Sequence, residues 1–205
     1  MSRFVRSIFL VTAVLALAAC SSTTFTSTWK APGVAPVSPV GKTIATVFVT
    51  RDEGKRRAAE DAMARDLTER GAHGVPAYTI LPENVRADAE KARVLLKDAG
   101  VNAVVISRVV GKDQQINYTP GTSFPTYYGG FGPYWGHGWG AAYDPGYLTT
   151  DTYVSVETTL YTVPGDKLLW ASTSRTANPS NIDTLVNEVA DATAKEMKKQ
   201  GFLAP

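Results

Sequence analysis

Apolar residues recur along the chain with two different periods, which predict alternating strands and helices. Residues 43–50 (TIATVFVT) are rich in β-branched and aromatic side chains, as strands are. Residues 52–70 change to a helical period, and Gly71 follows where that helix would end. The apolar stripe of the predicted helix consists of Ala59, Ala62, Met63 and Leu67.

A second strand and helix and a third strand follow in the same manner. Residues 75–81 predict a short strand that ends at Pro82, and residues 84–99 predict a helix that ends before Gly100. Residues 102–110 (NAVVISRVV) form a continuous apolar run, which is typical of a central strand covered on both faces. The apolar face of the second helix would consist of Val85, Ala89, Ala92, Leu96 and Ala99.

The C-terminal third predicts a β-hairpin and a last helix. Residues 153–161 alternate with a period of two, residues 164–166 (PGD) suit a turn, and residues 167–173 predict the returning strand, with Trp170 in the core. Residues 180–200 predict a helix with a capping box at Ser180 and Asp183. The inward hairpin positions are Val154, Val156, Thr158 and Leu160, and the helix would bury Ile182, Leu185, Val186, Val189 and Met197.

The order of elements is therefore β-α-β-α-β, then a β-hairpin, then α. Alternating strands and helices favour parallel pairing, and the hairpin adds antiparallel strands. We predict an α/β fold in a single domain over residues 42–203, with a mixed β-sheet on which the helices pack.

The N-terminus has the pattern of a secretory signal peptide. Arg3 and Arg6 precede an apolar run over residues 8–19, which is shorter than the roughly 20 residues that span a bilayer. Small residues then lead to Cys20, the only cysteine. The sequence Leu17-Ala18-Ala19-Cys20 resembles the lipobox of bacterial lipoproteins. The resemblance implies removal of residues 1–19, acylation of Cys20, and, with Ser21 next, an outer-membrane address facing the periplasm.

Residues 20–41 predict a lipidated flexible tether, since they are rich in Ser, Thr and Pro. Phe25 and Trp29 interrupt this polar composition, and two alternatives stay open for them. They dock on the domain as an edge strand, or they stay available to a membrane or a partner.

The charge of the chain excludes one class of partner. Removal of residues 1–19 takes away two arginines, so that 19 basic residues face 19 acidic ones. A neutral surface has no electrostatic footprint for nucleic acid, and we expect no nucleic-acid partner.

Several phrases resemble known envelope proteins. KTIATVFV, RRAAEDAMARDLTERGA and AYTILP look like the opening of the N-terminal domain of TolB. CSSTTFTSTWKAP and LYTVPGDKLLWAS are similar to phrases of bacterial envelope lipoproteins. Relatives of this fold include activators of peptidoglycan synthases and a subunit of the curli secretion channel. The resemblance thus implies an envelope protein or peptidoglycan as partner, and binding rather than catalysis.

An insertion at residues 118–148 separates the third strand from the hairpin. It is rich in glycine and aromatic residues and contains no lysine or arginine. Tyrosine and tryptophan are enriched in binding hot spots, so a partner-binding loop is one reading, and a merely tolerated insertion is the other. The candidate partner-binding residues are Phe124, Tyr127, Tyr128, Phe131, Tyr134, Trp135, Trp139, Tyr143 and Tyr147.

The chain carries little that predicts catalysis. His73 and His137 are its only histidines, and no cluster of metal ligands accompanies them, so we expect neither a metal nor a cofactor. The neighbouring carboxyls Glu60 and Asp61, like Asp88 and Glu90, are expected on solvated helix faces.

These observations predict a non-enzymatic, outer-membrane-anchored periplasmic lipoprotein that acts as a binding or accessory module of the cell envelope. One alternative is an oligomeric structural or secretion-channel component, with the insertion in a pore. A cell-envelope hydrolase, which would need His73 or His137, is the other. The sequence does not fix the oligomeric state.

Overall fold

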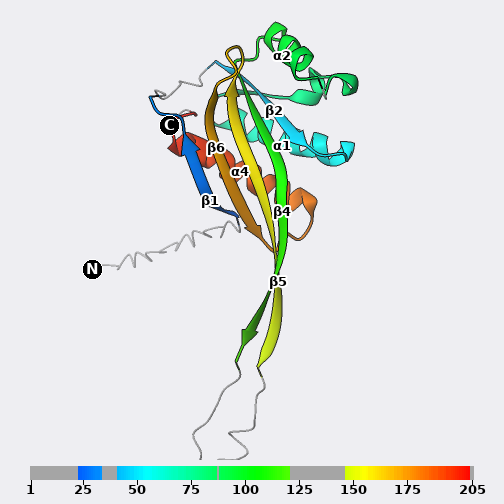
Figure 1. Cartoon of the computed structure of the whole chain (residues 1–205), viewed down its shortest axis with the longest axis vertical. Helices are drawn as coiled ribbons and strands as arrows, with labels where there is room; N and C mark the ends of the chain where they lie inside the picture. Colours follow the sequence, from blue (N-terminus) through cyan, green and yellow to red (C-terminus); the bar gives the residue numbers. More distant parts are fainter. Residues whose placement is uncertain (1–22, 34–40, 87, 121–145, 204–205) are drawn as a thin grey trace, which may run out of the picture.

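The described part of the chain forms one mixed six-stranded sheet with helices packed on it (Figure 1). The computed structural model describes residues 23–33, 41–86, 88–120 and 146–203. The strand order is β1-β6-β5-β4-β2-β3, which confirms the predicted α/β class. The elements are β1 (Thr23–Lys30), β2 (Thr43–Val49), α1 (Glu53–Glu69), β3 (His73–Pro76), η1 (Ala77–Thr79), η2 (Glu83–Val85), α2 (Ala89–Asp98), β4 (Ala103–Thr119), β5 (Tyr147–Thr162), β6 (Leu168–Ala177) and α4 (Ile182–Lys199).

Parallel and antiparallel pairs divide the sheet as the order of elements predicts. β2 pairs in parallel with β3 and with β4, and the chain crosses between them through helices. β4, β5, β6 and β1 pair antiparallel. The predicted hairpin is therefore the β5–β6 pair.

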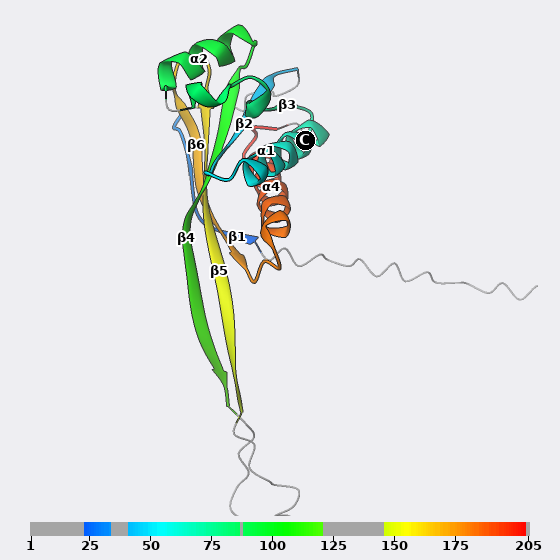
Figure 2. The same cartoon turned by 90° about the vertical axis from the view of Figure 1, so that its right-hand side faces the viewer.

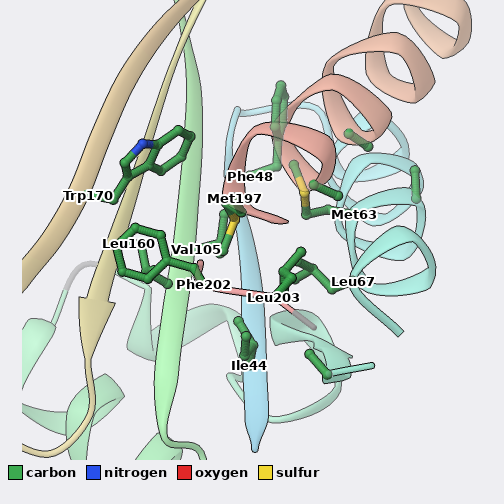
Figure 3. Close-up of a cluster of buried hydrophobic side chains, with 14 of the residues drawn as sticks. Ile44, Phe48, Met63, Leu67, Val105, Leu160, Trp170, Met197, Phe202 and Leu203 are labelled. Atoms are coloured by element: carbon green, nitrogen blue, oxygen red, sulfur yellow. The ribbon is translucent and has the colours of Figure 1, made fainter. Parts of the chain in front are cut away.

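The larger core lies between the sheet and the helices α1 and α4 (Figures 2 and 3). Trp170 of β6 is fully buried there and stands opposite Leu160 of β5. Val105 of β4 and Met197 of α4 pack in the same cluster. The predicted core position of Trp170 and the inward face of the hairpin are thus confirmed.

The opposite face of the sheet is covered only near one end. There Ala77 of η1, Leu81 and Leu96 of α2 pack with Ala45 and Val104 of the sheet. β4 is therefore covered on both faces near its start, as predicted. The cover ends within the strand, because Val109 and Val110 are exposed.

Three boundaries next to helices and 3₁₀ turns differ from the prediction, each where a side chain binds a backbone N–H. β3 ends at Pro76, since the Tyr78 backbone N–H donates to Glu60 at 2.7 Å instead of to a strand. α2 begins at Ala89, because Asp88 caps it by accepting from the Lys91 N–H. The last helix is capped by Asn181 rather than by Ser180.

The predicted tether is wrong over residues 23–30, which form the edge strand β1. β1 pairs antiparallel with β6, and the Phe25 ring lies edge-on to Trp170 with centroids 6.4 Å apart. The Lys30 Nζ donates to the Gln200 carbonyl of the C-terminal region at 2.7 Å. The edge-strand alternative for Phe25 and Trp29 is therefore confirmed. Residues 20–22 and 34–40 lie outside the described part.

No helix within the described ranges is both long and apolar enough to cross a membrane.

Two tryptophans on neighbouring strands make a matched test of this core. Trp170→Ala should lower the free energy of unfolding by about 3–5 kcal/mol, because it removes a fully buried ring. Trp29→Ala should cost less than about 1 kcal/mol, since that side chain is 47% exposed on the other face of the sheet. Denaturant unfolding measures both, and equal losses would contradict the core described above.

Candidate binding surfaces

The strands β4 and β5 continue beyond the rest of the sheet as a two-stranded ribbon (Figures 1 and 2). The last pair between β5 and β6 joins Tyr153 to Ala177. Beyond it, residues 114–119 pair only with residues 147–152, and we call these two stretches the arm. Six residue pairs at about 3.4 Å per residue give the arm a length of roughly 20 Å.

The root of the arm is fixed to the end of β6 by Asn178. Its side-chain Oδ1 accepts from the Thr152 N–H at 2.8 Å, and its own N–H donates to the Thr152 carbonyl at 2.7 Å. Its Nδ2 donates to one oxygen of Asp151, and Asn117 donates to the other. Asn178 has a positive φ of 47°, a conformation that asparagine tolerates better than most residues. The direction of the arm is thus set by the body.

The arm is polar near the body and apolar at its outer end. Gln114, Gln115 and Asp151 lie in the rows next to the root, and Asp151 is the only charged residue of the arm. Ile116 and Leu148 are 72% and 69% exposed, and Tyr118 pairs with Leu148 on one face. The exposed apolar residues of the outer end are Ile116, Tyr118, Tyr147 and Leu148.

Of the sequence-predicted site residues, only Tyr147 lies in the described part, where it is exposed in the first row of β5. The predicted insertion boundaries of 118 and 148 were wrong, because strand pairing extends to Thr119 and resumes at Tyr147. Alternation of Ile116 and Tyr118 with polar neighbours was the signal that could have revealed this. The candidates outside the described residues are Cys20, Phe124, Tyr127, Tyr128, Phe131, Tyr134, Trp135, Trp139 and Tyr143.

A second surface is a cleft of about 550 Å³ between α2 and the sheet. Its apolar lining comes from Val47, Ile106 and Tyr161 of the sheet and from Ala92 and Leu96 of α2. The helix α2, which lines this cleft, lies at the end of the molecule opposite the arm (Figure 2). Sequence reasoning missed the cleft, since it forms only where α2 crosses strands distant in the chain.

Glu60 lines the cleft and is 1% exposed, contrary to the solvated position that we expected. Its Oε2 accepts from the Tyr78 N–H at 2.7 Å, and its Oε1 accepts from the Phe48 N–H at 3.2 Å. Burial raises the pKa of this carboxyl, and the two backbone bonds and Arg56 oppose the rise. Glu60 follows Arg56 and precedes Met63 at helical spacing, so the sequence held a signal for its burial.

The arginines around the cleft already have carboxylate partners. Arg56 and Arg86 both bind Glu53, at 2.8 and 2.7 Å, and these bonds hold the pKa of Glu53 far below its usual range. Arg93 binds Glu90 and lies 3.5 Å from Asp166. The cleft therefore offers mainly apolar contacts.

The remaining candidate chemistry is not brought together. His73 is exposed at the start of β3, Asp61 accepts from the Tyr78 hydroxyl, and Asp88 caps α2. His137 lies outside the described part. Among the residues that are described, no group of three potential ligands is placed to hold a metal ion. Within the described ranges these candidate groups therefore lie apart from one another.

The pH dependence of the free energy of unfolding tests the buried position of Glu60. Its folded-state pKa is raised, so folding takes up a proton above the ordinary value of 4.5, and its contribution to stability falls as the pH rises beyond that value. Glu60→Gln removes this dependence and leaves one backbone N–H without its acceptor, at a cost of about 1–3 kcal/mol. The stability difference between wild type and variant, measured by urea unfolding, should therefore shrink from pH 5 to pH 8.

Glu69→Gln on the exposed face of the same helix is the matched control and should leave the pH profile of wild type unchanged. A constant difference for Glu60→Gln across this range would contradict the raised pKa.

Comparison with known proteins adds resemblance in fold only. No protein-family model matches the sequence, and no curated protein matches it. Solved structures with a similar fold include a PelC dodecamer from Paraburkholderia phytofirmans, at 15% identity over 89% of this chain and 99% of that chain, with a TM-score of 0.49. The lipoprotein GNA1162 from Neisseria meningitidis is 16% identical over 77% of this chain and 99% of that chain, with a TM-score of 0.41. Similarity at this level assigns neither a family nor a function, and the TolB resemblance stays a prediction.

Proposed function

We propose that this chain is a lipid-anchored, non-enzymatic binding module of a bacterial cell envelope, held at the outer membrane and facing the periplasm. The observation that carries the proposal is the arm with its exposed apolar outer end. The sequence between Thr119 and Tyr147, with the aromatic candidates named above, belongs to the same proposed binding element.

The physical chemistry of the arm supports a surface that is covered in the working state. A two-stranded ribbon is marginally stable by itself, and open strand edges are prone to pair with another chain. Exposed apolar side chains at its outer end add a further cost in water, and clusters of this kind mark interaction sites. A partner that covers the arm would relieve these costs.

The lack of assembled reacting groups in the described part supports a role without catalysis. Glu60 has a raised pKa beside a cleft, which is a usual sign of an active site. Both of its oxygens, however, accept hydrogen bonds from the backbone of β2 and η1. Glu60 therefore joins three elements of the fold, and its carboxyl serves structure.

Lipid anchoring is tested at Cys20. Cys20→Ala should abolish incorporation of labelled palmitate, because no other thiol exists in the chain. It should also move the protein from the outer-membrane fraction to the soluble or unprocessed pool, since acyl chains provide the attachment. Ser21→Ala is the matched control and should still be acylated; unchanged labelling of Cys20→Ala would contradict the anchor.

The arm is tested by shortening it. Joining Asn117 to Thr149 through an Asn-Gly turn removes residues 118–148 and keeps the opposed pair Asn117 and Thr149. Because the core lies elsewhere, the unfolding temperature should change by less than about 5 °C, whereas crosslinking to envelope partners should disappear.

Val94→Ser, a change at an exposed position on α2, should leave the same crosslinks intact. Crosslinks that survive shortening of the arm would argue against its role in binding.

A further inference from the structure

We infer that the outer end of the arm lies in the interfacial layer of the same bilayer that holds the acyl group. The inference rests on the proposed anchoring at Cys20 and names the surface that the arm contacts. The protein would then touch its membrane at two points, the acylated N-terminus and the pair of rows with Tyr118, Tyr147 and Leu148.

The proposed anchor enters the fold at the start of β1. Thr23 of β1 pairs with Thr176, which pairs with Val154, which in turn pairs with Lys112. Thr23 thus lies in the sheet row two before the arm begins. Cys20 precedes Thr23 by three positions, and a fully extended chain spans at most about 3.6 Å per residue. An acylated Cys20 is therefore within about 11 Å of Thr23, at the start of β1.

The arm extends farther from the row of Thr23 than the chain between Thr23 and Cys20 does. Seven residues separate the row of Lys112 from that of Thr119, which is about 24 Å at the rise of a strand. The arm therefore extends more than twice as far as the anchor is able to reach. Figures 1 and 2 show β1 starting on the side of the body from which the arm projects, with α2 at the far end. A membrane surface at the anchor is thus within reach of the outer end.

The exposed apolar and aromatic side chains lie at the outer end of the arm. Ile116 and Leu148 are apolar and largely exposed, and Tyr118 and Tyr147 add amphipathic rings of the kind that collect at headgroup level. The rows nearer the root carry Gln115 and Asp151. The residues suited to lipid therefore lie at the part of the arm that reaches farthest.

Depth and charge restrict the contact further. Within the described ranges, the two strands of the arm pair only with each other, and an open sheet edge is not tolerated against the hydrocarbon core. The arm has no basic residue, so attraction to anionic lipid does not contribute. These two facts point to an interfacial contact with apolar and aromatic character, insensitive to salt.

Single-cysteine labelling of the acylated full chain tests the inference, because the sulfur of Cys20 would carry lipid and resist labelling. An environment-sensitive dye at Leu148→Cys is compared with the same dye at Val94→Cys, on exposed α2 at the opposite end. The protein is reconstituted in phosphatidylcholine vesicles that contain a lipid with a quencher near its headgroup. Quenching at position 148 should exceed that at position 94 at least three-fold, and should persist in 0.5 M salt. Gln115→Cys, nearer the root, should give an intermediate value.

Each outcome separates the inference from the function on which it rests. Protein that floats with vesicles but shows equal quenching at positions 148 and 94 would overturn the membrane contact and leave the anchor intact. Protein that fails to float, or that takes up two dyes because Cys20 is unmodified, would overturn the anchor itself. Protection of position 148 only after an envelope protein is added would assign the arm to a protein partner and reject the bilayer.

Discussion

The antiparallel pairing of β4 with β5 joins the core to the arm, and the other features of the molecule depend on it. Near one end of the pair, Val105 and Leu160 stand opposite each other beneath α1 and α4. Near the other end, Tyr118 and Leu148 stand opposite each other in solvent. The buried half supplies the stability that a two-stranded ribbon lacks by itself. The packed half of β4 and β5 therefore sets the direction in which the arm projects.

Unequal cover on the two faces of the sheet accounts for both binding surfaces. α1 and α4 cover one face, whereas α2, with ten residues, covers only part of the other. The part left open carries polar contacts beside the exposed Trp29: the Arg175 guanidinium lies 3.7 Å from the Tyr153 ring centroid, and Arg108 binds Glu157 at 2.5 Å. The cleft forms beneath α2, where Val47, Ile106 and Tyr161 give this face an apolar lining. The packed core therefore shields neither the arm nor the cleft from solvent.

The sequence predicted those elements whose stability comes from regular burial. The helical period of Met63 and Leu67 indicates which face of α1 is buried. The alternation of Val156 and Leu160 does the same for the β5–β6 hairpin, so the sequence predicted both elements. The errors arose where a single side chain or an exposed strand decides the structure. Glu60 ends β3 early by binding the Tyr78 N–H, and no local pattern reports such a distant bond.

The sequence left β1 open as one of two alternatives and missed the arm, for a different reason. Both are rich in threonine and other polar residues, and composition alone assigns such segments to a tether or a loop. Their pairing partners, β6 for β1 and residues 147–152 for 114–119, lie far away or across the insertion. Strand pairing of this kind depends on contacts at long sequence separation, which a local period does not contain.

The docking of β1 changes what lipid anchoring implies for the molecule. A coil over residues 20–41 would let the domain wander about 25 Å from its acyl group in any orientation. With β1 paired to β6, only Ser21 and Ser22 lie between Cys20 and the start of the fold at Thr23. The proposed lipid would then fix which end of the domain meets the bilayer, namely the end with the arm. The cleft under α2 lies at the opposite end and would face away from the bilayer. The membrane would therefore contact one end of the sheet, and any ligand of the cleft would bind at the other end.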